Sequence, residues 1–197
     1  YRNTPQWFIS MEKNNLRDIA LKSIDETIFY PPQGQTRLRS MIETRPDWCV
    51  SRQRVWGVPL PLFVNKKTGQ PLRDENIINR IADIYEKEGS NTWFTEDPQR
   101  FLGDEYSLED YEQVKDVVEV WFDSGSTHAF CLEQREDLKW PASMYLEGSD
   151  QHRGWFHSSL LESSGTRGKA PYESVLTHGF VVDGRGRKMS KSLGNVI

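Results

Sequence analysis

The strongest indication of the fold is a strand, a polar turn and a helix in direct succession toward the C-terminal end of the sequence. Residues 144–146 form a short apolar run, residues 147–151 are polar, and residues 153–163 are predicted to form a helix. This succession is the repeating unit of a doubly wound α/β sheet. Ligands of such sheets bind beyond the carboxyl ends of the strands, so the polar turn is a candidate binding site.

Other segments predict further elements of the same architecture. We expect strands at residues 5–10 and 117–122, and extended chain over residues 175–183. Apolar side chains in residues 16–28 recur at near-helical spacing, and the two prolines that follow would end this helix. A second short helix is predicted over residues 36–44. Together these segments favour an α/β fold.

Residues 60–119 differ in kind and look like an insertion into the main sheet. They contain a turn, an amphipathic helix over residues 74–88 and an acidic stretch with little periodicity. One face of that helix should carry Ile77, Ile78, Ile81, Ile84 and Tyr85. The expected division is therefore a core over residues 1–59, an α+β insert over 60–119, and a return to the core over 120–197.

Composition excludes several classes of protein. Hydrophobic residues make up 36% of the 197 residues, and no apolar run approaches the roughly 20 residues that span a bilayer. The net charge of −4 argues against a generally basic nucleic-acid binder. Cys49 and Cys131 form neither a disulfide framework nor a zinc pattern, and His152 and His157 lack a metal-pair spacing. We therefore expect a cytoplasmic protein with no membrane contact and no metal site in this chain.

The densest cluster of charge lies close to the end of the sequence. Arg185, Arg187, Lys188 and Lys191 place four cations within seven residues, and glycines flank them. A flexible basic loop suits a polyphosphate, because mobile ammonium groups can close on charge that shifts during a reaction. A solvated basic turn is the alternative from charge alone.

The literal string KMSKS in this loop, with its context, resembles the second signature of the class I aminoacyl-tRNA synthetases. Four further strings accompany it: RPDWCVSRQRVWG at residues 45–57, VWFDSGSTH at 120–128, YLEGSDQHRGWF at 145–156 and LTHGF at 176–180. The second and third strings point to the isoleucine family within this class. The resemblance covers essentially the whole chain.

The resemblance implies roles for particular residues. In the family the second lysine of the signature contacts ATP phosphates, which maps to Lys191, with Lys188 in support. The motif itself is Lys188, Met189, Ser190, Lys191 and Ser192. The residues implied to bind ATP or the adenylate are Glu147, Gly148, Asp150, Gln151, His178, Gly179 and Lys191.

The resemblance also implies that Trp121 and Trp155 line the isoleucine pocket. Rigid rings fill space beside a branched aliphatic side chain without presenting many polar atoms. For the other tryptophans a place in the core or on the surface is expected: Trp7, Trp48, Trp56, Trp93 and Trp140.

The implied reaction is ATP-dependent activation of L-isoleucine to isoleucyl-adenylate, followed by transfer to tRNA(Ile). Mg²⁺ would accompany the nucleotide, and the parent enzyme would be a cytoplasmic monomer. The implied fold is the second half of a split Rossmann-type sheet. The first half with its His-Ile-Gly-His tetrapeptide, the editing domain, the anticodon-binding helices and any zinc module would lie outside this chain, whose first residue reads as a trimmed end. The piece alone is expected to be inactive.

Three alternatives remain open from the sequence. A valine or leucine synthetase would share the class but differ in its pocket residues. A non-catalytic module derived from a synthetase could bind RNA or protein, although the intact basic loop argues against it. A plain phosphate-binding α/β domain would leave the tryptophan-containing strings unexplained.

Overall fold

The computed structural model describes residues 3–196, which divide into two compact units. Unit 1 takes in residues 3–8 and 49–120, and unit 2 takes in residues 9–48 and 121–196. Within the described residues, no helix is both long and apolar enough to cross a membrane.

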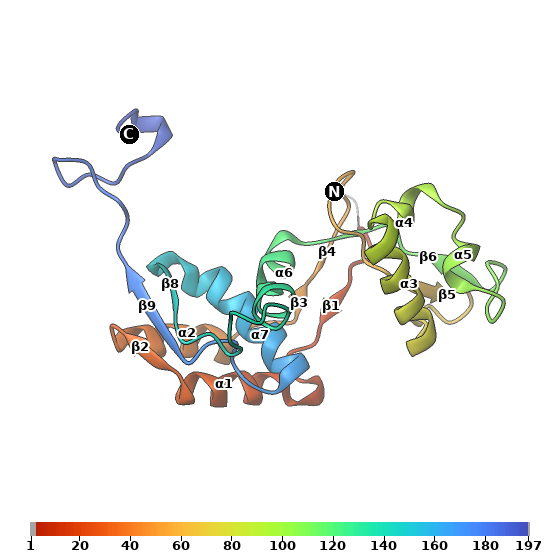
Figure 1. Ribbon diagram of the computed structural model, residues 1–197, viewed down its shortest axis with the longest axis horizontal. Coiled ribbons are helices and arrows are strands. Elements are labelled where there is room, and N and C mark those ends of the chain that lie inside the picture. The colour runs from red at the N-terminus through yellow and green to blue at the C-terminus, as the bar shows by residue number, and fades with distance from the viewer. Residues whose placement is uncertain (1–2, 197) are drawn as a thin grey trace. The chain divides into compact units, whose positions relative to one another are not determined.

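The elements are as follows (Figure 1). The strands are β1 (Phe8–Ile9), β2 (Ile28–Tyr30), β3 (Trp48–Cys49), β4 (Ser51–Arg52), β5 (Phe63–Asn65), β6 (Tyr111–Gln113), β7 (Val117–Val118), β8 (Tyr145–Gly148) and β9 (Ser174–His178). The helices are α1 (Leu16–Glu26), α2 (Gln33–Glu43), α3 (Glu75–Glu88), α4 (Thr92–Thr95), α5 (Gln99–Leu102), α6 (Val120–Gly125) and α7 (Trp155–Arg167). Shorter helical turns are η1 (Lys13–Asn15), η2 (His128–Leu132), η3 (Ser149–Arg153) and η4 (Lys191–Leu193).

Unit 2 is built on a parallel sheet of β2, β9 and β8, in that order. Strand β9 pairs with β2 from Ile28↔Ser174 and with β8 from Tyr145↔Val175. The chain passes from β8 through η3 and α7 back to β9, which is a β–α–β crossover between neighbouring parallel strands. The predicted α/β class with a parallel sheet is confirmed.

The core of unit 2 lies where α1 packs on α7 and α2. Helix α1 presents Leu16, Ala20 and Ile24 at helical spacing, and all three are buried. Helix α7 is buried along most of its length, so its apolar residues do not form a single stripe. Phe156 and Leu160 are fully buried within it.

The strand predicted over residues 117–122 is wrong in its second half. Only Val117 and Val118 pair in a strand, and helix α6 begins at Val120, whose side chain is 66% exposed. The helical turn places Phe122 against Trp48. It also places Gly125 so close to α7 that a Cβ there would lie 3.0 Å from the carbonyl carbon of Ser158. Close packing of this helix on α7 therefore overrides the strand preference of residues 120–122.

Other predicted boundaries also shift. The first helix ends at Glu26 because β2 follows it, and α2 begins at Gln33 directly after the prolines. The strand expected over residues 5–10 shrinks to β1, and α7 continues to Arg167. The extended chain expected over residues 175–183 forms a strand only as far as His178.

Unit 1 has its own core around a fully buried tryptophan, Trp93. Its neighbours in that core are Phe63, Ile77, Ile81, Phe101 and Leu102. The Trp93 Nε1 donates to the carbonyl oxygen of Val114 at 2.8 Å. Helix α3 begins as predicted, with Asp74 accepting from the Asn76 amide at 2.9 Å, but Ile78 is exposed and leaves the apolar face.

The units divide the chain at positions 8/9, 48/49 and 120/121, whereas the sequence suggested an insert over residues 60–119. Unit 1 gains the earlier residues because β4 pairs with β7, with Ser51 opposite Val118. The assignment of residues 60–119 as a connective insert remains a prediction.

A buried histidine in α7 should make stability depend on pH. Burial, followed by the charge of Arg45, lowers the pKa of His157 to about 3. An imidazole in the unfolded chain has a pKa of about 6.5. Between these values the unfolded chain binds a proton that the folded chain excludes, so stability should fall as the pH falls through this window, by at most about 1.4 kcal/mol per pH unit.

Urea unfolding of the 197-residue chain between pH 7 and pH 4 measures this slope. A His157→Leu variant removes the titrating group and should show a shallower pH dependence than the wild-type chain. Identical slopes for the two proteins would contradict the proton-linkage explanation.

Candidate functional site

The carboxyl ends of β8 and β9 lie side by side and form the floor of the candidate site. The parallel register sets Glu147 opposite Thr177 and Gly148 opposite His178. Glu147 Oε1 accepts from the Gly148 amide at 2.9 Å and lies 3.9 Å from His178 Nε2. The Glu147 and His178 side chains are both about half exposed, so they remain accessible to a ligand. The structure thus brings together two segments that the sequence places 30 residues apart.

The turn after β8 folds back over the strand end. A Cβ on Gly148 would lie 2.6 Å from Asp150 Oδ1, so a side chain at this position would displace the Asp150 carboxylate. Gln151 donates from Nε2 to Asp150 Oδ2 at 3.1 Å. Its Oε1 accepts from the Trp155 amide at 2.9 Å, at the start of α7. Gln151 therefore links the polar turn to the N-terminus of the helix that follows.

Trp155 is the first residue of α7, and Trp121, which belongs to α6, lies beside the same end of that helix. Trp155 stacks on Tyr145 with ring centroids 4.0 Å apart and planes at 5°, and its Nε1 donates to the Ser124 carbonyl oxygen at 3.0 Å. The Trp121 ring approaches Gly154 so closely that a Cβ there would lie 2.9 Å from Cη2. Trp155 is held on both sides, while Trp121 is 42% exposed.

The segment after β9 forms a hairpin that carries the basic residues (Figure 1). An isolated bridge joins Val182 to Lys188, and the Met189 amide donates to the Val181 carbonyl oxygen at 2.9 Å. The Asp183 amide donates to the Arg187 carbonyl oxygen at 2.9 Å. Gly186 turns the chain with φ +76°, a conformation that favours glycine.

The four cations of the loop differ in their contacts. The Arg187 guanidinium binds the Asp183 carboxylate, and Lys188 Nζ lies 3.5 Å from the centroid of the Phe180 ring. Arg185 and Lys191 are exposed, and within residues 3–196 neither side chain has an ion-pair partner. Two cations are thus engaged within the loop and two face solvent.

Sequence reasoning missed the residues that shape this loop, namely Asp183 and Asn195. Asp183 accepts from the amides of Arg185 and Arg187, and Asn195 donates to it from the far side of the motif. Their only sequence signal is position: Asp183 precedes a glycine and Asn195 follows one. Among the residues that the structure describes, no group of three or more His, Cys, Asp or Glu side chains is arranged to hold a metal ion.

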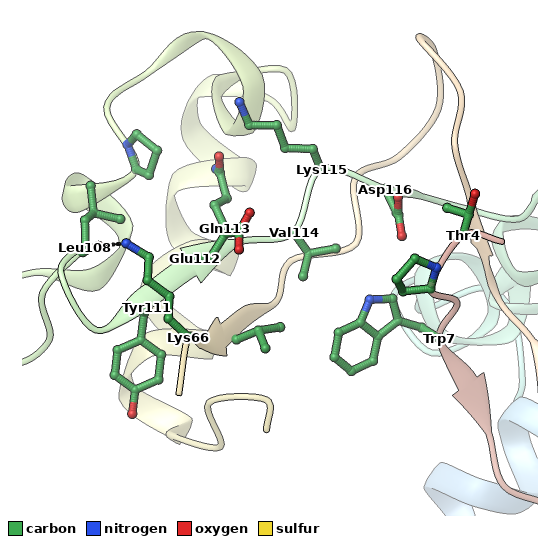
Figure 2. Close-up of a pocket in the computed structure, with 13 residues that line it drawn as sticks. Thr4, Trp7, Lys66, Leu108, Tyr111, Glu112, Gln113, Val114, Lys115 and Asp116 are labelled. Atoms are coloured by element: carbon green, nitrogen blue, oxygen red, sulfur yellow. Dashed lines mark hydrogen bonds between the residues drawn. The ribbon is translucent and has the colours of Figure 1, made fainter. Parts of the chain in front are cut away.

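A separate groove of about 720 Å³ lies in unit 1. Figure 2 shows Trp7, Lys66 and Lys115 among its lining side chains, with Lys66 bound to the Leu108 carbonyl oxygen. None of the residues assigned to a site from the sequence lines this groove.

Gly154 should be intolerant of a side chain. A methyl group there would lie 2.5 Å from Gln151 Oε1 and 2.9 Å from the Trp121 ring, so one of them must move. Gly154→Ala should destabilise the chain by about 1–3 kcal/mol and change the near-ultraviolet circular dichroism of the tryptophans. Gly184→Ala is the matched control, because a Cβ at Gly184 meets no atom within 4 Å. Equal stability of the two variants would contradict the close packing inferred here.

Comparison with known proteins identifies the family. A sequence profile described as tRNA synthetases class I (I, L, M and V) matches residues 1–197. The chain is 73% identical over 197 residues to an isoleucine–tRNA ligase of Pelagibacter ubique and 62% identical over 203 residues to one of Brucella abortus. All of the chain is covered in both cases, but it spans only 22% and 21% of those relatives.

A solved structure supports the same fold. The methionyl-tRNA synthetase of Mycobacterium tuberculosis bound by methionyl-adenylate aligns with a TM-score of 0.53 at 19% identity, over 98% of this chain and 29% of that protein. The chain therefore has the Rossmann-like fold of class I synthetase catalytic domains. Since the family profile covers the sequence from end to end, this chain belongs to the class I tRNA synthetases of the I, L, M and V group.

Proposed function

We propose that this chain is part of an isoleucine–tRNA ligase that activates L-isoleucine with ATP and transfers it to tRNA(Ile). One observation carries the proposal: the string from Lys188 to Ser192 begins on a hairpin that follows the strand edge formed by Glu147 and His178, and it ends in the turn η4. The 73% identity to an isoleucine–tRNA ligase over the whole chain supports the choice of amino acid.

In the proposed reaction, the residues at the carboxyl ends of β8 and β9 and in the basic loop position the substrates and neutralise charge. The isoleucine carboxylate attacks the α-phosphorus of ATP, and pyrophosphate leaves. No side chain has to act as a nucleophile, so the protein must align the two substrates and stabilise charge on the phosphates. Lys191 suits the second task because its ammonium group is exposed and has no ion-pair partner among the described residues.

The remaining site residues fit the adenylate. The Glu147 carboxylate can accept hydrogen bonds from ribose hydroxyls or from an α-ammonium group. Gly148, Asp150 and Gln151 shape the turn around it, and His178 and Gly179 border the nucleotide. Trp121 and Trp155 would flank the isoleucine side chain, with Trp155 fixed by Tyr145 and by Ser124.

Other partners follow from the proposed reaction. Mg²⁺ would arrive with the nucleotide phosphates, and we assign no residue of this chain to it. The tRNA, a monomeric parent enzyme and a cytoplasmic setting belong to the same proposal. Residues 60–119 are proposed as the connective insert of the catalytic core.

Two other functions make different predictions. A valine or leucine ligase would keep the phosphate-binding loop and change the preferred amino acid. A binding module without catalysis would show no activation of any amino acid. Lys191 is exposed and has no ion-pair partner within residues 3–196, which favours catalysis, because a binding module needs no free lysine to close on phosphates.

Amino-acid-dependent ATP–pyrophosphate exchange on the full-length parent enzyme tests the proposal, with isoleucine, valine, leucine and methionine as substrates. We expect strong exchange with isoleucine and weaker exchange with valine, which lacks one methylene group. Lys191→Ala should lower kcat by about a hundredfold, as expected for loss of a group that stabilises transition-state charge.

Lys67→Ala provides the charge-matched control, since Lys67 is an exposed lysine of unit 1. Preference for another amino acid would reject isoleucine and keep the class. Absence of exchange with all four would reject the catalytic function.

A further inference from the structure

The carboxylate of Asp183 is fully engaged by the loop that carries the signature lysines. Its Oδ1 accepts from the amides of Arg185 at 2.9 Å and Arg187 at 3.0 Å. Its Oδ2 accepts from Arg187 Nε at 3.0 Å and from Asn195 Nδ2 at 2.9 Å. These bonds, that of Asn195 first among them, lower the pKa of Asp183 to about 2. The side chain is only 14% exposed, so this acid points into the loop and not toward solvent.

Asn195 connects Asp183 to the signature motif by further hydrogen bonds. Besides its bond to Asp183, Asn195 Nδ2 donates to the Lys188 carbonyl oxygen at 3.2 Å. Its Oδ1 accepts from the Ser190 amide at 2.9 Å. We call Asp183 and Asn195 the clasp, because together they bind backbone on both sides of Met189.

The clasp continues directly into the turn that holds Lys191. Ser190 Oγ accepts from the Leu193 amide at 3.3 Å and caps η4, of which Lys191 is the first residue. A continuous series of hydrogen bonds therefore runs from Asp183 through Asn195 and Ser190 to the Leu193 amide. The same turn is closed by the Gly194 amide, which donates to the Lys191 carbonyl oxygen at 3.2 Å. The Lys191 side chain itself takes no part in these bonds and remains exposed.

An acidic residue beside a phosphate-binding loop needs a physical explanation. A free carboxylate would repel the phosphates of ATP, but the Asp183 charge is balanced by Arg187 and by three further N–H donors. The loop also contains Gly184, Gly186 and Gly194, which increase the conformational entropy that ordering must overcome. The clasp supplies hydrogen bonds that offset this entropy.

We propose that Asp183 and Asn195 are positioning residues for amino-acid activation, and that their clasp fixes the backbone from which Lys191 reaches the ATP phosphates. This inference rests on the proposed function and adds two residues to it. Neither residue touches substrate in this proposal. Their effect passes through the orientation of the lysine, where a displacement of about 1 Å can cost a hundredfold in rate.

The test uses the full-length parent enzyme and isoleucine-dependent ATP–pyrophosphate exchange. Asp183→Ala and Asn195→Ala should each lower kcat by about tenfold or more while the KM for isoleucine stays within about twofold, because the amino-acid pocket is untouched. Asp137→Ala is the matched control: Asp137 also binds an arginine guanidinium, that of Arg135, but lies outside the loop.

A reciprocal exchange of the two side chains separates positioning from simple damage. Asp183→Asn replaces one accepting oxygen by a donor that faces other N–H donors, and Asn195→Asp places two carboxylates face to face. Each change should lower kcat. The double variant restores a donor and an acceptor across the clasp, so it should recover at least about threefold in kcat over the weaker single variant. Trypsin should also cleave the single variants faster than wild type after the loop arginines and lysines, which reports loop order without any activity.

Three results would each overturn the proposed role of the clasp. They are an unchanged kcat in the alanine variants, a double variant with no higher kcat than the worse single variant, and unchanged cleavage by trypsin. A parallel loss of isoleucine affinity and of thermal stability would also overturn it, since that pattern indicates general unfolding. Failure of the proposed function is distinguishable, because wild-type enzyme itself would then show no isoleucine-dependent exchange.

Discussion

The pairing of β8 with β9 is the contact on which the candidate site depends. Because the strands are parallel and in register, Gly148 lies opposite His178, and both strands end at the same edge. An antiparallel pairing would send the two strand ends to opposite sides of the sheet. A slip of one residue would turn Glu147 to the other face. The register therefore decides whether the polar turn and the basic loop can serve one ligand.

A second set of contacts holds the start of α7 against the amino-terminal ends of the same two strands. Tyr145 stacks on Trp155 from within β8, and its burial raises its pKa to about 12, which keeps the phenol neutral. Tyr172, just before β9, donates from its hydroxyl to the Phe156 carbonyl oxygen at 3.1 Å. Aromatic side chains from the starts of the two strands thus hold the helix that follows β8 in place. Rigid support of this kind is what a positioning mechanism requires.

The sequence predicts the architecture of this chain better than its details. Succession of strand, polar turn and helix was sufficient to predict the β8–α7 crossover, and apolar spacing was sufficient for α1 and α3. The strand prediction over residues 117–122 was wrong in its second half because local strand preference contains no information about the close approach of Gly125 to α7. That contact joins residues distant in the sequence, and no local pattern encodes it.

The candidate site shows the same limit. Each site residue was assigned from a motif, but their mutual placement needed the register of β8 and β9. Asp183 and Asn195 were not assigned at all, since a single acid and a single amide beside glycines are common in ordinary turns. Their role in the loop is visible only in the folded structure, where a hydrogen bond joins these two positions, 12 residues apart, across the signature motif.

A crystal structure of the full-length parent enzyme with a non-hydrolysable isoleucyl-adenylate analogue tests the central claim most directly. We predict that the ribose and α-ammonium groups lie within hydrogen-bonding distance of the Glu147 turn, with the isoleucyl side chain beside Trp121 and Trp155. An analogue bound away from the carboxyl ends of β8 and β9 would contradict the assignment of this edge as the adenylate site.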